Sequence, residues 1–302
     1  MNTLTNLIRS AHSSLTLKPC ASYFARQFGY ELVGEGALWK RSNYKLFHRK
    51  LPHFIHNRSE DPYTIPFKIS LRTVTSRLGF SYANDGWHPF VQTLKEYEQN
   101  PELRYEDSTL AKLYERYCPR NVHEVLLDHI SVPLKPFCDW PPKNHLIRWV
   151  WALNHTSVRK SLKFFNNNGD EDGWIFFGPH TPEYGQREFN RLIGVYESIK
   201  KNGYRTGLAG VDPVNGYFLK YRDKTRFVLL QGNHRISALK ALGYTEVEVL
   251  VRRGHPAVVD REHLLRWTEG GGGIYSDEVV THLFDALFQE TGVQKAKRYN
   301  LA

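Results

Sequence analysis

The chain has 302 residues, a formal net charge of +10 and an aromatic content of 14%. Its length exceeds that of most single domains, and its aromatic content excludes a chain that is disordered throughout. The positive charge favours an anionic partner, such as a nucleotide, a phosphorylated sugar, a nucleic acid or an acidic membrane surface. The basic residues occur as short pairs and triplets, which excludes the long basic tract of a nucleic-acid-binding tail.

The cysteines and the N-terminal segment bear on the cellular compartment. Cys20, Cys118 and Cys138 are widely separated and odd in number, which excludes a disulfide framework and a zinc motif and favours a reducing compartment. Residues 1–17 lack the continuous apolar stretch of a secretory signal, and no later stretch is long enough to cross a membrane. We therefore expect a cytoplasmic protein without a transmembrane segment.

The first half of the chain predicts a mixture of strands and helices. Alternating polar and apolar residues around glycines predict a β-hairpin or a small meander within 29–48. Apolar residues at helical spacing then predict three helices, over 89–100, 108–117 and 121–128. Four prolines within 132–143 exclude a regular helix and mark a candidate domain boundary. We therefore expect an N-terminal mixed α/β domain over residues 1–143.

The second half, residues 144–302, predicts strands and helices in a clearer order. The expected strands lie at 174–177, 214–221, 225–230 and 247–251. Three helices are expected. The first lies at 186–201, the second follows the strand at 225–230 directly, and the third lies at 276–291 after a run of four glycines. This order predicts an α/β (α+β) fold class.

The segment 227–243 is the most informative one, because an apolar strand, a polar turn and a helix follow one another directly. Gly232 permits a sharp turn, and Gly243 ends the helix. Unpaired backbone N–H groups and the positive end of the helix dipole favour an anion at such a helix start. His234 and Arg235 add two cationic or hydrogen-bond-donating side chains there. The sequence therefore predicts a phosphate-binding turn.

The order of elements around this turn, with Gln-Gly-Asn-His-Arg-Ile-Ser-Ala-Leu over 231–239, resembles the ParB/sulfiredoxin superfamily across residues 174–253. Members carry a comparable Gly-x-His-Arg or Gly-Glu-Arg-Arg turn that binds nucleotide phosphates. The resemblance implies a mixed sheet with helices over 144–302, and ATP or another nucleotide as ligand. It does not by itself decide the reaction, because several chemistries share this scaffold.

Three branches of the superfamily differ in what the turn does. Sulfiredoxins need a Cys beside the His-Arg pair, where this chain has Asn233. ParB partition proteins continue into a helix-turn-helix DNA reader, for which the segment after Arg253, interrupted by glycines, leaves little room. The turn suits the free serine kinases best. The resemblance therefore implies a kinase-like, nucleotide-dependent phosphotransferase acting on a small-molecule or saccharide hydroxyl, and the alternative is a non-catalytic nucleotide- or nucleic-acid-binding protein.

Six residues are the candidates for holding the nucleotide: Gln231, Gly232, Asn233, His234, Arg235 and Ser237. Each of them also has an ordinary structural role open to it. Gly232 can simply make a turn, and the polar side chains can cap the helix or fill space. Arg235 can bind phosphate with two parallel hydrogen bonds, or it can pair with a carboxylate such as Glu188.

Phosphoryl transfer also needs a base and usually Mg²⁺, held by one or two carboxylates. Glu183 and Glu188 flank the start of the predicted helix at 186–201 and are the candidates for either role, with His234 as a third catalytic candidate. Both carboxylates equally suit a helix start, where they compensate the dipole. His53 and His56 have a spacing that permits a metal, but no third ligand stands near them, so we predict no dedicated metal site.

Overall fold

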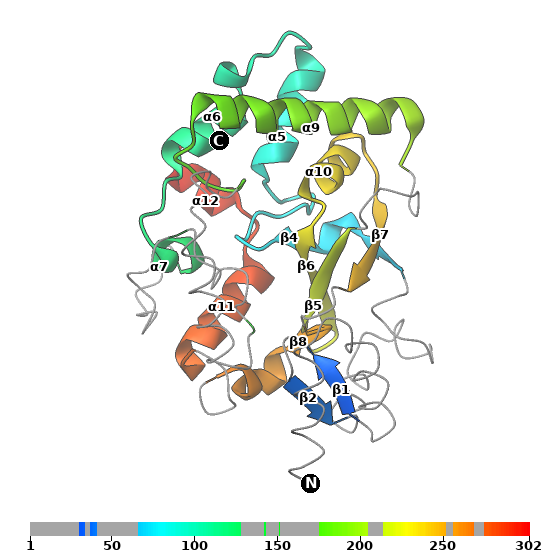
Figure 1. Cartoon of the computed structure of the whole chain (residues 1–302), viewed down its shortest axis with the longest axis vertical. Helices are drawn as coiled ribbons and strands as arrows, with labels where there is room; N and C mark the ends of the chain where they lie inside the picture. The colour runs from blue at the N-terminus through cyan, green and yellow to red at the C-terminus, as the bar shows by residue number, and fades with distance from the viewer. Residues whose placement is uncertain are drawn as a thin grey trace, which may run out of the picture.

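The computed structural model describes residues 66–127, 142, 151, 175–204, 214–251, 256–268 and 275–302, together with the backbone at 30–33 and 37–40. These residues form a mixed α/β structure with a six-stranded mixed sheet and several helices (Figure 1). The predicted fold class is confirmed at this level. No helix in the described part of the chain has both the length and the apolarity needed to cross a membrane.

The main sheet has the strand order β3-β7-β5-β6-β4, and β8 pairs with β5 as well. The strands are β3 (Phe67–Ser70), β4 (Val74–Ser76), β5 (Asn215–Tyr221), β6 (Lys224–Gln231), β7 (Glu246–Val251) and β8 (Val258–Asp260). β5 and β6 form an antiparallel hairpin, whereas β4 runs parallel to β6, and β7 and β8 run parallel to β5. The carboxyl ends of β4 and β6 therefore lie side by side at one edge of the sheet.

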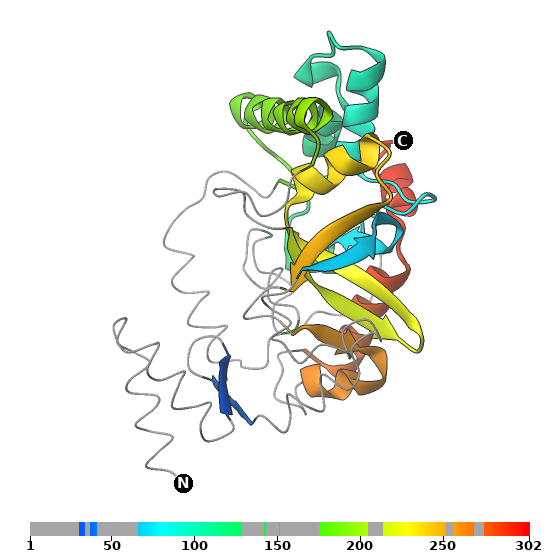
Figure 2. The same cartoon turned by 90° about the vertical axis from the view of Figure 1, so that its right-hand side faces the viewer.

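The helices cover this edge and one side of the sheet. They are α5 (Pro89–Gln99), α6 (Thr109–Arg116), α7 (Val122–Leu126), α9 (Pro182–Asn202), α10 (Asn233–Ala241), α11 (Asp277–Gln289) and α12 (Val293–Arg298). Short 3₁₀ helices lie at Leu71–Thr73, Tyr105–Asp107 and Arg261–Trp267. α9 packs across α10 and α5 beyond the strand ends, and α11 runs along the sheet (Figures 1 and 2).

Side-chain caps explain where most of these helices begin. The side chains of His88, Ser108, Asn121, Thr181 and Ser276 each accept a hydrogen bond from a first-turn N–H group, at the starts of α5, α6, α7, α9 and α11. α10 and α12 start differently, after Gly232 and Gly292 in the left-handed conformation, which offer no side-chain cap. The first turn of α10 therefore lacks the side-chain acceptor that these five helices have.

Most predicted elements are confirmed within two residues at their ends. The hairpin within 29–48 corresponds to β1 (Tyr30–Val33) and β2 (Ala37–Lys40), which pair antiparallel. The predicted strand at 174–177 is wrong, because residues 175–177 form a turn in which Phe176 and Phe177 are buried in the core. Their apolar character reflects burial and not strand structure. The helix predicted at 186–201 begins earlier, at Pro182, because Thr181 caps it.

The main sheet combines both halves of the chain. β3 and β4 come from the part assigned to residues 1–143, and the other four strands come from 144–302. One hydrophobic cluster likewise contains Phe90 of α5 together with Leu192 of α9 and Leu239 of α10. The predicted boundary at 132–143 lies outside the described residues apart from Pro142, so the division into domains stays a prediction, but residues 66–76 are part of the sheet that carries the turn.

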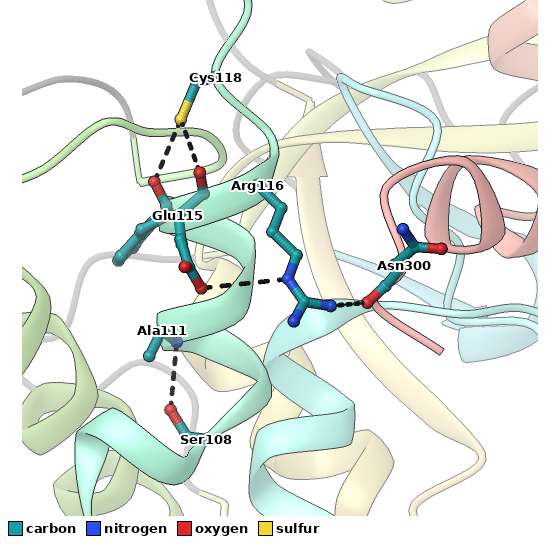
Figure 3. A network of polar contacts seen from close by, with 7 residues as sticks. Ser108, Ala111, Glu115, Arg116, Cys118 and Asn300 are labelled. Carbon is teal, nitrogen blue, oxygen red and sulfur yellow. Dashed lines mark hydrogen bonds and ion pairs between the residues drawn. The ribbon is translucent and has the colours of Figure 1, made fainter.

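The C-terminal end of the chain returns to α6. The Arg116 guanidinium donates to the carbonyl oxygen of Asn300 (Figure 3). Lys295 of α12 is buried, donates to the Leu78 carbonyl at 3.0 Å, and lies 5.2 Å from the ring centre of Tyr117. A buried ammonium needs such acceptors and aromatic faces to replace water. These contacts fasten α12 to α6 and to the segment after β4.

Two glycines of α9 provide a matched test of this packing. A Cβ at Gly185 would overlap the hydroxyl group and ring of the buried Tyr105, whereas a Cβ at Gly194 would meet nothing within 4 Å. We expect Gly194→Ala to raise the free energy of unfolding by about 1 kcal/mol, because alanine favours the helix. Gly185→Ala should lower it by about 1–3 kcal/mol through overpacking. Urea unfolding measures both, and equal effects would contradict this close approach of α9 to Tyr105.

Candidate functional site

Gly232 makes the turn between β6 and α10. It has φ +104° and ψ 22°, a left-handed conformation that favours glycine. A Cβ at this position would also lie 2.9 Å from Cγ2 of Val214, so the turn leaves no room for a side chain. The Ile236 N–H donates to the Gly232 carbonyl at 3.0 Å and closes the first helical turn. The predicted succession of strand, turn and helix is confirmed.

The adjacent strand ends add polar groups that the sequence did not indicate. Arg77 directly follows β4, and its Nη2 donates to the Leu230 carbonyl at 2.9 Å. Asn215, at the start of β5, donates through Nδ2 to Oε1 of Gln231 at 2.9 Å. The side-chain oxygen of Gln231 is therefore engaged within the sheet edge. Only the parallel pairing of β4 with β6 brings Arg77 here, and the sequence contained no signal for that pairing.

The structure brings two of the predicted catalytic residues together. Nε2 of His234 lies 3.0 Å from Oε2 of Glu188, and both side chains are buried. The other carboxylate oxygen of Glu188 lies 3.7 Å from Nη1 of Arg191. The ring of Phe90 stacks on His234 with a centroid distance of 5.2 Å. His234 is thus fixed between α9 and α5. The sequence named Glu188 as a possible partner of Arg235, and the structure shows Glu188 in contact with His234.

Opposing influences act on the Glu188 carboxyl group. Burial works to raise its pKa, but the contact with His234 and the charges of Arg191 and Arg187 outweigh burial and hold the pKa below its ordinary value. A carboxylate with a lowered pKa is a weak proton acceptor. One of its oxygens faces the His234 ring and the other faces the Arg191 guanidinium, so the geometry favours a structural or electrostatic role for Glu188 over that of base or metal ligand.

Glu183 lies elsewhere on α9. It is exposed and belongs to the first turn of that helix. Five residues separate it from Glu188, which corresponds to a rotation of roughly 140° around the helix axis. Since Glu188 faces α10, Glu183 points to a different side. This position agrees with the alternative stated for Glu183, a carboxylate that compensates the helix dipole.

Arg235 lies over the turn. It is half-buried, and its Nη2 lies 3.4 Å from the position that a Cβ of Gly232 would occupy. Its charge also acts on the phenol of Tyr204, whose pKa is raised by burial against the lowering effect of Arg235. The guanidinium is therefore within reach of an anion bound at the first turn of α10.

Asn233 and Ser237 occupy different environments on α10. Oδ1 of Asn233 is buried and has no hydrogen-bond partner among the described residues. Ser237 is fully buried, with its Oγ 3.4 Å from the Tyr82 hydroxyl. The structure thus leaves an unused acceptor at the helix start in Asn233, whereas the burial of Ser237 favours its space-filling role over phosphate binding.

His88 lies beside this site at the start of α5. Its Nδ1 accepts from the Phe90 N–H at 3.2 Å, and its ring stacks on Tyr82 at 4.4 Å. Burial, and then repulsion from His234, lowers the pKa of His88 to about 3. His88 is therefore neutral near pH 7. A proton on Nε2 follows from the acceptor role of Nδ1.

A second group of titratable residues lies away from the turn. Asp260, Glu262 and His263 bring ligand-type atoms within 4.8 Å of one another. Asp260 already accepts from the Glu262 N–H at 3.1 Å and lies 3.3 Å from the Lys220 ammonium. β8 pairs with residues 218–220 of β5, the end of that strand remote from Gln231. Asp260 caps the 3₁₀ helix at Arg261–Trp267, which accounts for this cluster. The cluster contributes no group to the turn at 231–235.

Comparison of the chain with protein-family models, with curated proteins and with solved structures finds no match. The resemblance to the ParB/sulfiredoxin superfamily therefore rests on the residues of the turn and on the order of elements around it.

The burial of His88 predicts a pH dependence of stability. The unfolded chain binds a proton at this residue below about pH 6.5, whereas the folded protein binds it only near pH 3, so His88 makes stability fall as the pH drops through this window. We expect His88→Asn, which keeps a helix cap, to flatten the fall by up to about 1.4 kcal/mol per pH unit. Urea unfolding of both proteins between pH 7 and pH 4.5 measures the slopes, and parallel slopes would refute the neutral buried state.

Proposed function

We propose that this protein is a ParB/sulfiredoxin-like phosphotransferase that binds ATP or another nucleotide at the turn 231–235. In this proposal it transfers the terminal phosphoryl group to a hydroxyl of a small molecule or saccharide. The observation that carries the proposal is the first turn of α10, which starts behind Gly232 without a side-chain cap and has His234 and Arg235 on it. Such a turn supplies backbone donors and positive charge for a phosphate.

The residues of the turn divide the task of phosphate binding. Gly232 lets the backbone approach the phosphate, because no side chain stands in the way. The guanidinium of Arg235 provides parallel N–H donors that match two phosphate oxygens. Arg77 adds a charge beneath the turn, at the adjacent strand end. The overall charge of +10 favours the approach of a multiply charged nucleotide.

The transfer step requires an in-line attack by the acceptor hydroxyl on the terminal phosphorus, with the nucleoside diphosphate leaving and the hydroxyl proton passing to a base. The two predicted carboxylates do not fit a Mg²⁺ site at the turn, because Glu188 faces His234 and Arg191 and Glu183 is exposed on another side of α9. Mg²⁺ therefore enters no step of this proposal through those residues.

The contacts of Glu188 with His234 and Arg191 favour one alternative function, in which the protein binds a nucleotide or nucleic acid without transferring phosphate. Phosphate binding at the turn needs no base, so it is compatible with a carboxylate that faces His234 and Arg191. The two functions share the same turn and differ in turnover.

Turnover separates these two functions. We expect the purified protein to convert ATP to ADP when a pool of small hydroxyl metabolites is added, and to show little conversion without it. An assay of ADP release measures this. Absence of turnover, together with nucleic-acid affinity that falls steeply with salt as counterions are released, would overturn the transfer step and support the binding function.

Removal of one guanidinium tests the turn itself. We expect Arg235→Ala to weaken ATP binding by about 10- to 100-fold, because it deletes charge-assisted hydrogen bonds to phosphate. The matched control is Lys224→Ala, which removes an exposed cation at the opposite end of β6. Isothermal titration calorimetry measures both affinities, and circular dichroism checks the fold. Equal affinities of the two variants would contradict phosphate binding at the turn.

A further inference from the structure

A group of positively charged side chains lies at the end of α10 that is remote from the turn. Arg72, Lys95 and Lys240, from three different elements, form this cationic cluster. We propose that the cationic cluster and the exposed side chain of Tyr244 form a docking surface for single-stranded nucleic acid. Lys240 lies in the last turn of α10, roughly 10 Å along the helix axis from the first residue of that helix. The surface is therefore separate from the phosphate-binding turn, and the inference goes beyond the proposed nucleotide site.

Contacts between separate elements hold the cationic cluster together. Lys95 belongs to α5, which packs against α10. The Lys240 ammonium donates to Oδ1 of Asn84 at 2.9 Å, in the segment that leads into α5. Burial, and then the charges of Lys95 and Arg72, lower the pKa of Lys240. The positive charges of α5 and of the 3₁₀ helix that contains Arg72 therefore act on the same ammonium group of α10.

The backbone at Tyr244 connects the end of α10 with the neighbourhood of Arg72. The Leu71 N–H donates to the Thr245 carbonyl at 2.9 Å, which joins the residue before Arg72 to the residue after Tyr244. Figure 2 shows the start of β7 beside the end of β3 at this place. Tyr244 is 39% exposed, whereas most tyrosines in the described part of the chain are buried. An aromatic ring is thus accessible beside the cationic cluster.

The cationic cluster has no compensating carboxylate in the part of the chain that the structure describes. No ion pair joins any of its three side chains to an acidic residue there. The acidic side chains nearest to it in sequence have other partners: Glu96 accepts from Thr109, Glu98 interacts with Tyr196, Glu246 lies 2.5 Å from Lys68, and Asp85 acts on Arg226. Like charges gathered in this way repel one another, and a bound anion relieves that repulsion.

An ordinary solvated basic surface accounts for only part of this arrangement. Lys240 suits the last turn of α10, where it compensates the negative end of the helix dipole. That role does not extend to Arg72 and Lys95, which come from other elements, and it leaves the exposed Tyr244 without a function.

Single-stranded nucleic acid fits the cations and the ring together. Lysine and arginine bind successive phosphates, and a tyrosine ring stacks on a base whatever its identity. A duplex covers the faces of its bases, and an acidic peptide supplies carboxylates for the cations but no base to stack on Tyr244. The combination of charge and aromatic surface therefore favours single strands over these other anionic partners.

The experiment is a titration of a fluorescein-labelled oligothymidylate of about 12 nucleotides with the whole protein, followed by fluorescence anisotropy at several salt concentrations. We expect Arg72→Ala and Lys95→Ala each to weaken binding several-fold and to reduce the slope of log affinity against log salt by about 0.7. Tyr244→Ala should weaken binding about 5- to 100-fold, whereas Tyr244→Phe keeps the ring and should bind as the wild type does. The matched control, Lys224→Ala, removes an exposed cation at the far end of β6 and should leave the affinity nearly unchanged.

The remaining measurements separate this surface from the turn and from other anionic partners. Unchanged oligonucleotide affinity in Arg235→Ala supports a separate surface. A loss in Arg235→Ala, with Arg72→Ala and Lys95→Ala unchanged, would assign nucleic acid to the turn and overturn the inference. Displacement of the oligonucleotide by polyglutamate or by phosphatidylserine vesicles, without any effect of Tyr244→Ala, would reveal a general anion surface and overturn it as well. The inference also fails if the wild type does not bind the oligonucleotide at about 50 mM salt. Circular dichroism checks that each variant is folded.

Discussion

The parallel pairing of β4 with β6 is the constraint on which the site depends. It places residue 77 beside residue 230 at one edge of the sheet, and α10 starts from that same edge after a single glycine. α9 and α5 then close over α10, and their side chains meet around His234. Without this pairing, the turn would still form locally, but the groups from four separate elements would not converge on it.

The electrostatics of the buried cluster follow from this arrangement. Three titratable side chains, Glu188, His88 and His234, come close together where water is largely excluded. Burial disfavours the charged forms of Glu188 and His88, so a nearby opposite charge decides whether either of these two groups is ionised. The contact with His234 and the charges of Arg191 and Arg187 hold the pKa of Glu188 below its ordinary value, whereas burial, and then repulsion from His234, keeps His88 neutral. The same contact joins α9 to α10, within the hydrophobic core that both helices share.

The local elements were largely predictable from the sequence, and the failures have a common cause. Periodicity placed β5, β6, β7, α5, α6 and α11 within two residues, because their apolar faces repeat regularly. The apolar run at 174–177 carries the same signal as a strand but forms a buried turn, since burial alone selects apolar residues. The cap at Thr181 lengthened α9 beyond its apolar pattern. Within the site, Arg77 and His88 escaped prediction because they reach it from distant parts of the chain.

By itself the sequence determined the strand, the glycine turn and the helix at 227–243, because backbone freedom at Gly232 and helical periodicity are local properties. It also determined that His234 and Arg235 stand at the helix start. Only the tertiary structure decided which groups accompany them: Glu188 faces His234, Glu183 faces another side of α9, and the sheet takes β3 and β4 from the first half of the chain. These outcomes depend on helix packing and strand pairing between segments far apart in sequence, and no local pattern encodes them.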